Sequence, residues 1–173
     1  MIINSDERQW TWMDEGLNTF VQFLTEKEFD RDYPSRRGSA RNIREYMGGD
    51  KTRISPIMTN SESIYQFGNN AYGKPATALN ILRETVMGRD LFDHAFKEYS
   101  RRWAFKHPSP ADFFRTMEDA SGVDLDWFWR GWFYTTDHVD IAMEDIKWMQ
   151  MDSQNPDVEA AFREASDLSL IHI

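Results

Sequence analysis

The sequence predicts a mainly α-helical protein with at most one β-strand, near residues 138–148. Apolar residues recur at helical spacing in several long segments, and residues that favour helix starts and stops flank those segments. An alternating apolar pattern is confined to one late stretch, HVDIAMEDIKW. Hydrophobic residues make up 40% of the 173 residues, which is enough to form a core.

The first helix is predicted from about Trp10 to Phe29. One face of it carries the apolar residues Met13, Leu17, Phe20, Val21 and Leu24. The segment 35–53 that follows holds six Lys or Arg residues and only two acidic ones. We expect a solvated loop with a short helix near Ala40 to Met47, and a partner-binding surface is the alternative.

A second long helix is predicted after Gly68. Its apolar residues are Ala76, Leu79, Leu82 and Val86, and Gly88 is placed to end it. Asn69 or Asn70 is the expected N-cap, and Pro75 must then lie in the first turn, where it needs no N–H partner. Tyr72 falls at the very start of this helix.

Two further helices and a short aromatic one complete the pattern. Phe92, Ala95, Phe96, Tyr99 and Trp103 mark one helix. SPADFF starts the next, with Ser109 as N-cap, Pro110 at the first position, Asp112 as the acid of a capping box, and Gly122 as the stop. In DLDWFWRGWFY the aromatic residues are expected to pack in the core rather than line a substrate pocket.

Charge and composition exclude several classes of function. The net charge of -9 argues against binding to nucleic acid, and no apolar run approaches the ~18 residues of a membrane span. Because the chain has no Cys, it has no disulfide framework, thiol nucleophile or thiolate metal site. Any chemistry must use carboxylates, hydroxyls and the four His residues.

Three blocks, in this order and spacing, resemble a known family. These are WMDEGLNTF, AYGKPATALNILRETVMG and ADFFRTMEDASGVDLDWFWRGWFY. Together they resemble the catalytic domain of the membrane alanyl aminopeptidase family, the gluzincin zinc peptidases. The first matches the family's W-x-N-E-G with Asp14 in place of Asn, and the second matches Y-x-K-G with Pro75 in place of Gly.

The resemblance implies a fold, an activity and a set of site residues. Residues 1–137 would form the helical C-terminal lobe of a thermolysin-like zinc peptidase domain, and 138–148 would begin the next domain. Glu15 would be the third zinc ligand and Tyr72 the donor to the oxyanion of the tetrahedral intermediate. Trp12, Asp14 and Lys74 are expected around the metal or the substrate pocket. The implied substrate is a peptide or protein, cleaved at its N-terminal bond by metal-activated water.

The family's H-E-x-x-H helix is not found in this sequence. The spacing H-x18-E from Glu15 puts its second His before Met1, and no two of His94, His107, His138 and His172 form an i, i+4 pair. We therefore expect a fragment that lacks the metal helix, is inactive alone and does not bind zinc tightly. Residues 149–167 are expected to be a polar tail. Residues 168–173, LSLIHI, match the translation of a transposon-end sequencing adapter and are expected to be foreign to the protein.

A second class of function stays open on the sequence alone. The chain can also be interpreted as a non-catalytic helical interaction module derived from a peptidase, in which a cleft or the basic segment binds a protein. Oligomeric state, compartment and peptide specificity are not encoded in any feature that the sequence displays.

Overall fold

The computed structural model describes residues 2–138, 155–158 and 160. The chain divides into two units, residues 1–138 and 139–173. Within the described residues it forms helices joined by loops and no strand, which confirms the predicted mainly helical fold. The strand predicted near 138–148 and the stretch 168–173 lie outside the described residues, apart from His138, which is not in a strand.

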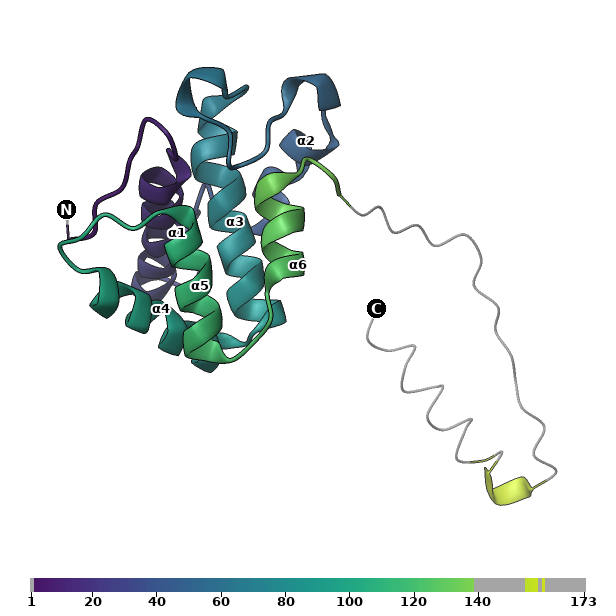
Figure 1. The fold of residues 1–173 in the computed structure, drawn as a ribbon. Coiled ribbons are helices and arrows are strands. Elements are labelled where there is room, and N and C mark those ends of the chain that lie inside the picture. The colour runs from purple at the N-terminus through teal and green to yellow at the C-terminus, as the bar shows by residue number, and fades with distance from the viewer. Residues whose placement is uncertain (1, 139–154, 159, 161–173) are drawn as a thin grey trace. The chain divides into compact units, whose positions relative to one another are not determined.

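The first unit contains six α-helices with short 3₁₀ and π-helical turns between them (Figure 1). The α-helices are α1 (Trp12–Phe29), α2 (Ala40–Gly48), α3 (Lys74–Ile81), α4 (Arg89–Trp103), α5 (Pro110–Ser121) and α6 (Asp126–Trp129). The short turns are η1 (Lys51–Arg53), η2 (Ser61–Ser63), η3 (Gly68–Gly73), η4 (Leu82–Val86) and η5 (Arg130–Tyr134).

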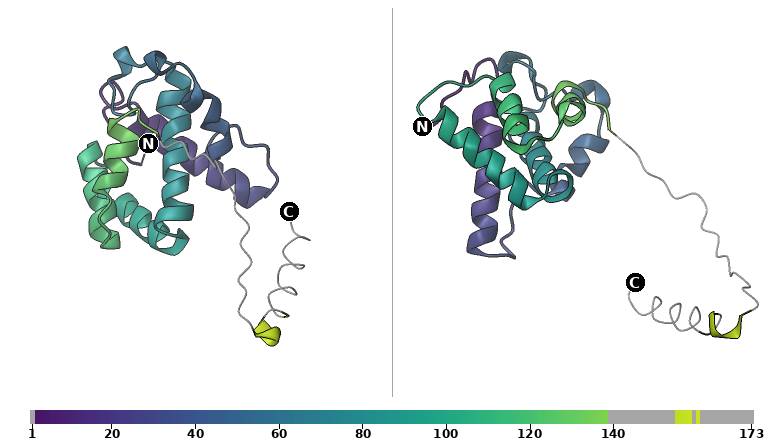
Figure 2. Two further views of the ribbon diagram at one scale, coloured as in Figure 1. Left: turned by 90° about the vertical axis from the view of Figure 1, so that its right-hand side faces the viewer. Right: turned by 60° about the horizontal axis from the view of Figure 1, so that its bottom comes forward.

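One continuous helical segment, η3–α3–η4, runs through the middle of the first unit. Every residue of α3 from Lys74 to Leu79 is buried, as expected of a helix covered on all sides. In the left view of Figure 2, α1 and α2 lie on one side of this segment and α5 and α6 on the other. Gly88 follows the segment with a positive φ of 79°, so the predicted stop is confirmed.

The start of this segment differs from the prediction. The π-helical turn η3 begins at Gly68, so neither Asn69 nor Asn70 is its N-cap. The buried side chain of Asn70 instead donates to the carbonyl oxygens of Ser55 at 2.7 Å and Pro56 at 3.1 Å. The Asn70 side chain, predicted to cap the helix, therefore binds a distant loop instead. Pro75 lies in the first turn of α3, as predicted.

Helix α1 begins two residues later than predicted and ends at Phe29 as predicted. Its buried face is centred on Met13, Gly16 and Phe20. Val21, which the sequence placed on this face, is 43% exposed because its side chain lies about 100° around the helix from Phe20.

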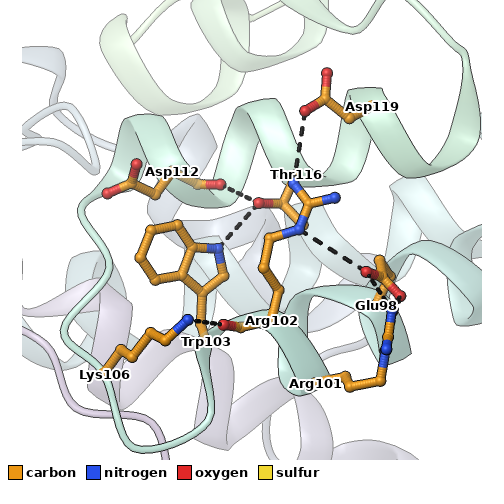
Figure 3. A network of polar contacts seen from close by, with 8 residues as sticks. All are labelled: Glu98, Arg101, Arg102, Trp103, Lys106, Asp112, Thr116 and Asp119. Carbon is orange, nitrogen blue, oxygen red and sulfur yellow. Dashed lines mark hydrogen bonds and ion pairs between the residues drawn. The ribbon is translucent and has the colours of Figure 1, made fainter.

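Helices α4 and α5 pack against each other through a polar network as well as through aromatic residues (Figure 3). The Trp103 indole N–H donates to Thr116 Oγ1 at 3.0 Å, and the Thr116 hydroxyl donates to the carbonyl oxygen of Asp112 at 2.5 Å. The guanidinium of Arg102 lies between Glu98 on its own helix, at 3.8 Å, and Asp119 on α5, at 3.6 Å. The predicted capping box of Ser109 and Asp112 is present in full, and Gly122 ends α5 in the left-handed conformation.

The core of the first unit is rich in aromatic rings. Trp12 of α1 meets Phe114 of α5 in a stacked pair with centroids 5.8 Å apart, and Phe133 of η5 lies 4.8 Å from the same indole. Phe128 and Trp129 are buried as well, which confirms the core prediction for most of the aromatic helix. Trp127 departs from that prediction, since it is 61% exposed on the outer side of a single-turn helix.

The basic segment after α1 forms the short helix predicted for it, observed as α2. Its apolar side chains Ile43 and Tyr46 join Ile54 in a small second cluster. In the second unit, the backbone N–H of Asp157 donates to Asn155 Oδ1 at 3.1 Å. No helix among the described residues is long and apolar enough to cross a membrane.

Candidate functional site

Two of the predicted site residues meet, although 57 positions separate them in the sequence. The phenol of Tyr72, on η3, donates to Glu15 Oε1, in the first turn of α1, at 2.5 Å. Both side chains are half-buried, so one side of the pair faces the core and the other faces solvent. The fold thus brings a carboxylate and a phenol to one place at the surface of the first unit.

A close helix–helix contact permits this meeting. A Cβ added to Gly16 would lie 2.6 Å from Cγ of Pro75 and 3.1 Å from the carbonyl oxygen of Ala71. Because Gly16 has no side chain, α1 can lie directly against the turn that carries Tyr72. Glu15 precedes Gly16 and is therefore held beside that turn.

The π-helical geometry of η3 suits the proline that follows it. The backbone N–H of Lys74 donates to the carbonyl oxygen of Asn69, five residues earlier, rather than to that of Asn70. Pro75 has no N–H and its ring would crowd the carbonyl four residues before it in a regular α-helix. The wider turn adds one residue to the helix at the point where Tyr72 is presented.

The hydrogen bond to Glu15 raises the pKa of Tyr72 to about 12, and burial and the Glu15 charge act in the same direction. The guanidinium of Arg37 lies over the Tyr72 ring, with its carbon 4.5 Å from the centroid, and opposes this shift. Phe67 meets the same ring edge-on at 6.1 Å. At neutral pH the phenol therefore keeps its proton and is a hydrogen-bond donor.

Asp14, the neighbour of Glu15, is half-buried and accepts a hydrogen bond from Asn18 Nδ2 at 2.9 Å. Burial is the largest cause that raises its pKa, followed by the charges of Glu7 and Glu15. As a carboxylate, Asp14 adds negative charge close to Glu15, and a nearby cation would be favoured at this end of α1.

The structure places Trp12 and Lys74 in the interior. The Trp12 side chain has no exposed area and packs among the rings of α5 and η5. Lys74 is 1% exposed, and its ammonium donates to the carbonyl oxygen of Thr135 at 3.3 Å. Burial is the main cause that lowers the pKa of Lys74 to about 8, and the charge of Lys51 lowers it further. Their roles at the site stay predictions.

Glu15 fits a metal-ligand role chemically. Its Oε1 accepts from Tyr72, whereas Oε2 has no hydrogen bond within the part of the chain that is described. Within the described residues, Glu15 does not belong to any set of three side chains placed to bind one metal ion. The one such set in those residues is Glu118, Asp124 and Asp126, on and after α5, where two of the carboxylates already accept backbone N–H groups. His94, His107 and His138 are exposed, and His172 lies outside the residues that the structure describes.

Sequence reasoning missed Gly16 and Arg37. The glycine directly after Glu15 was a usable signal, because a glycine inside a helix marks a close approach of another backbone or ring. Arg37 stood within a basic run that was expected to be solvated, and its contact with Tyr72 spans 35 residues of sequence.

Comparison with known proteins relates this chain to peptidases. Residues 3–132 match the peptidase family M1 domain. Among curated proteins, the chain is 23% identical over 142 residues to a glutamyl aminopeptidase from Sus scrofa, covering 79% of this chain and 15% of that protein. It is 22% identical over 152 residues to a probable aminopeptidase 1 from Sulfurisphaera tokodaii, covering 80% and 19%. The chain thus spans less than a fifth of the length of either relative. No solved structure matches it significantly.

Proposed function

The chain belongs to peptidase family M1, and on that premise we propose that it carries part of the active site of a zinc-dependent aminopeptidase. The observation that supports this most is the contact between Glu15 and Tyr72, which joins a carboxylate and a protonated phenol at one half-buried place. Both curated relatives carry aminopeptidase names. Because the chain is short beside them, the activity is proposed for the intact protein.

In this proposal, Glu15 holds the metal and Tyr72 acts on the substrate. Zinc, when bound, acidifies a water molecule and polarises the peptide carbonyl. Tyr72 keeps its proton at neutral pH and donates a hydrogen bond to the oxygen that becomes negative during attack. Glu15 and Asp14 keep the end of α1 attractive to a cation, and Gly16 holds α1 against the turn that presents Tyr72.

A catalytic zinc takes three protein ligands, and the described residues offer Glu15 as one of them. We infer that two histidines from elsewhere in the intact protein complete the site. The 173-residue chain alone would then bind zinc weakly and hydrolyse no peptide. The encoding gene can be read upstream of Met1 for an H-E-x-x-H at the family spacing.

The first test uses four variants of the intact protein. Glu15→Gln should lose bound zinc and hydrolysis of an aminoacyl amide together, because an amide is a poor zinc ligand. Tyr72→Phe should keep its zinc and lower kcat by about 10²- to 10³-fold, as expected for loss of one oxyanion donor. Glu28→Gln on the same helix and the exposed Tyr65→Phe are matched controls that should keep both properties. Zinc is measured by atomic absorption.

Retention of zinc and activity by Glu15→Gln would overturn the ligand assignment. Hydrolysis by the 173-residue chain with added zinc, abolished by Glu15→Gln, would contradict the inferred need for further ligands. An intact protein that neither binds zinc nor cleaves peptides would instead support a non-catalytic interaction module.

A further inference from the structure

A groove runs along α1, and Arg37 in its lining also contacts Tyr72. It has a volume of about 640 Å³ and lies between α1 and the segment 33–37. Its α1 wall includes Thr19, Gln22 and Glu26, which follow Glu15 at i+4, i+7 and i+11. Residues at these positions share one helix face, so Glu15 lies one turn before the groove on the same side of α1.

Arg37 belongs both to this groove and to the candidate site. It lines the groove, and its guanidinium lies over the Tyr72 ring. The guanidinium carbon lies 4.5 Å from the ring centroid. A guanidinium that stacks on an aromatic ring keeps the N–H donors at its edge available for hydrogen bonds. Within the described chain, neither Arg37 nor its neighbour Arg36 makes a side-chain hydrogen bond or ion pair, although both line the groove.

The segment that carries these two arginines is held in place. Gly38 has φ +94°, and a Cβ there would lie 2.4 Å from Cγ of Phe23 on α1, so only glycine fits. The Asn42 side chain of α2 donates to the carbonyl oxygen of Ser35 at 3.0 Å. The loop that carries the two arginines is therefore packed against α1 and hydrogen-bonded to α2.

The charge of the groove favours an anion. The lining of the groove includes two arginines, Arg36 and Arg37, and one carboxylate, Glu26, which already accepts a hydrogen bond from Gln22 at 2.7 Å. A guanidinium edge matches a carboxylate in two parallel hydrogen bonds. We propose that this groove binds a carboxylate of the peptide substrate through Arg37 and Arg36, next to the scissile bond. The proposal rests on the proposed function, because it names a group of the substrate for that site.

The test measures peptide binding to the 173-residue chain by titration of its amide NMR signals, without zinc. Three tripeptides of one backbone are compared: Ala-Gln-Ala amide, Ala-Glu-Ala amide and Ala-Gln-Ala with a free C-terminal carboxylate. We expect at least one carboxylate form to bind about fivefold tighter than the neutral amide, with shifts along α1 and the segment 33–37. Preference for the second peptide assigns the groove to an acidic side chain, and preference for the third assigns it to the chain end.

Arg37→Gln should abolish this preference, and Arg36→Gln is a second variant should the first not fold. Arg41→Gln is the matched control, since it removes the same charge from an exposed arginine on α2 that also lacks a partner in the described chain and lines no part of the groove. Equal binding of the three peptides overturns the proposal. An equal loss of preference in Arg41→Gln also overturns it, since overall charge would then explain the binding. These readouts need no hydrolysis, so they fail or succeed independently of the Glu15→Gln and Tyr72→Phe tests.

Discussion

Gly16 is the residue on which the meeting of Glu15 and Tyr72 depends most directly. Gly16→Ala should lower the free energy of unfolding by about 1–3 kcal/mol, because the new Cβ would overlap the Pro75 ring. Urea unfolding followed by circular dichroism measures this. Gly131→Ala is the matched control, since a Cβ there meets nothing within 4 Å. A loss of the same size in both variants would mean that glycine content, not the contact with Pro75, sets the cost.

The buried Lys74 makes the free energy of unfolding depend on pH, with a predictable sign. Its pKa falls from 10.5 to about 8 in the fold, so the unfolded chain binds its proton more tightly between those values. The free energy of unfolding should therefore rise with pH across this window, by about 3 kcal/mol from this group.

Comparison with Lys74→Met isolates that contribution. The stability difference between the wild type and Lys74→Met should shift by about this amount, in favour of the wild type, from pH 8 to 10.5. Lys97→Met, which removes an exposed ammonium from α4, controls for the loss of a lysine as such. A constant difference between the wild type and Lys74→Met across the window would show that the buried ammonium carries no such cost.

At the scale of elements, α5 and α2 offer a matched pair of helix starts. Ser109 caps α5, since its hydroxyl accepts from the Asp112 N–H and its own N–H donates to Asp112 Oδ2. Ser39 occupies the same position before α2 without a side-chain cap bond. Ser109→Ala should cost about 1 kcal/mol of unfolding free energy in urea titrations, whereas Ser39→Ala should change it by a few tenths. Equal effects would mean that the bonds of the capping box contribute little.

Helix starts and stops were predictable where their signals are local. The capping box at Ser109 and the stops at Gly88 and Gly122 depend on residues within one turn, and all three are as predicted. The N-cap before α3 was predicted wrongly because the Asn70 amide binds the carbonyls of Ser55 and Pro56, fifteen and fourteen residues away. Propensity cannot anticipate such a tertiary partner.

The candidate site, too, was predictable only in part. Glu15 and Tyr72 came from a family resemblance in the order of three blocks, since no periodicity places residues 57 apart in contact. No sequence feature predicted the contact of Arg37 with Tyr72 or the π-helical turn that lies between Phe67 and Lys74. Both depend on how loops and helices pack, which local sequence does not determine.

At the scale of the whole first unit, the aromatic cluster joins the beginning of that unit to its end. Phe133 of η5 is fully buried against Trp12 of α1 and Phe114 of α5. Phe133→Ala should therefore cost about 3–5 kcal/mol in urea unfolding, a large part of the stability of a domain of this size. Trp127→Ala, at a 61% exposed residue six positions earlier, should stay within about 0.5 kcal/mol. Comparable losses in the two variants would contradict the assignment of Phe133 to the core.

The π-helical turn at η3 also limits how this part of the chain can vary. Each residue of an α-helix advances the side chains by about 100°, and a π turn holds one residue more than an α turn. Deleting Gly73, which lies between Tyr72 and Pro75, would restore a regular helix but rotate Tyr72 relative to Pro75. The phenol could then face Glu15, or the proline could face Gly16, but not both. Substitutions here change side chains, whereas insertions and deletions change the phase of the helix, so the length of this turn is more constrained than its composition.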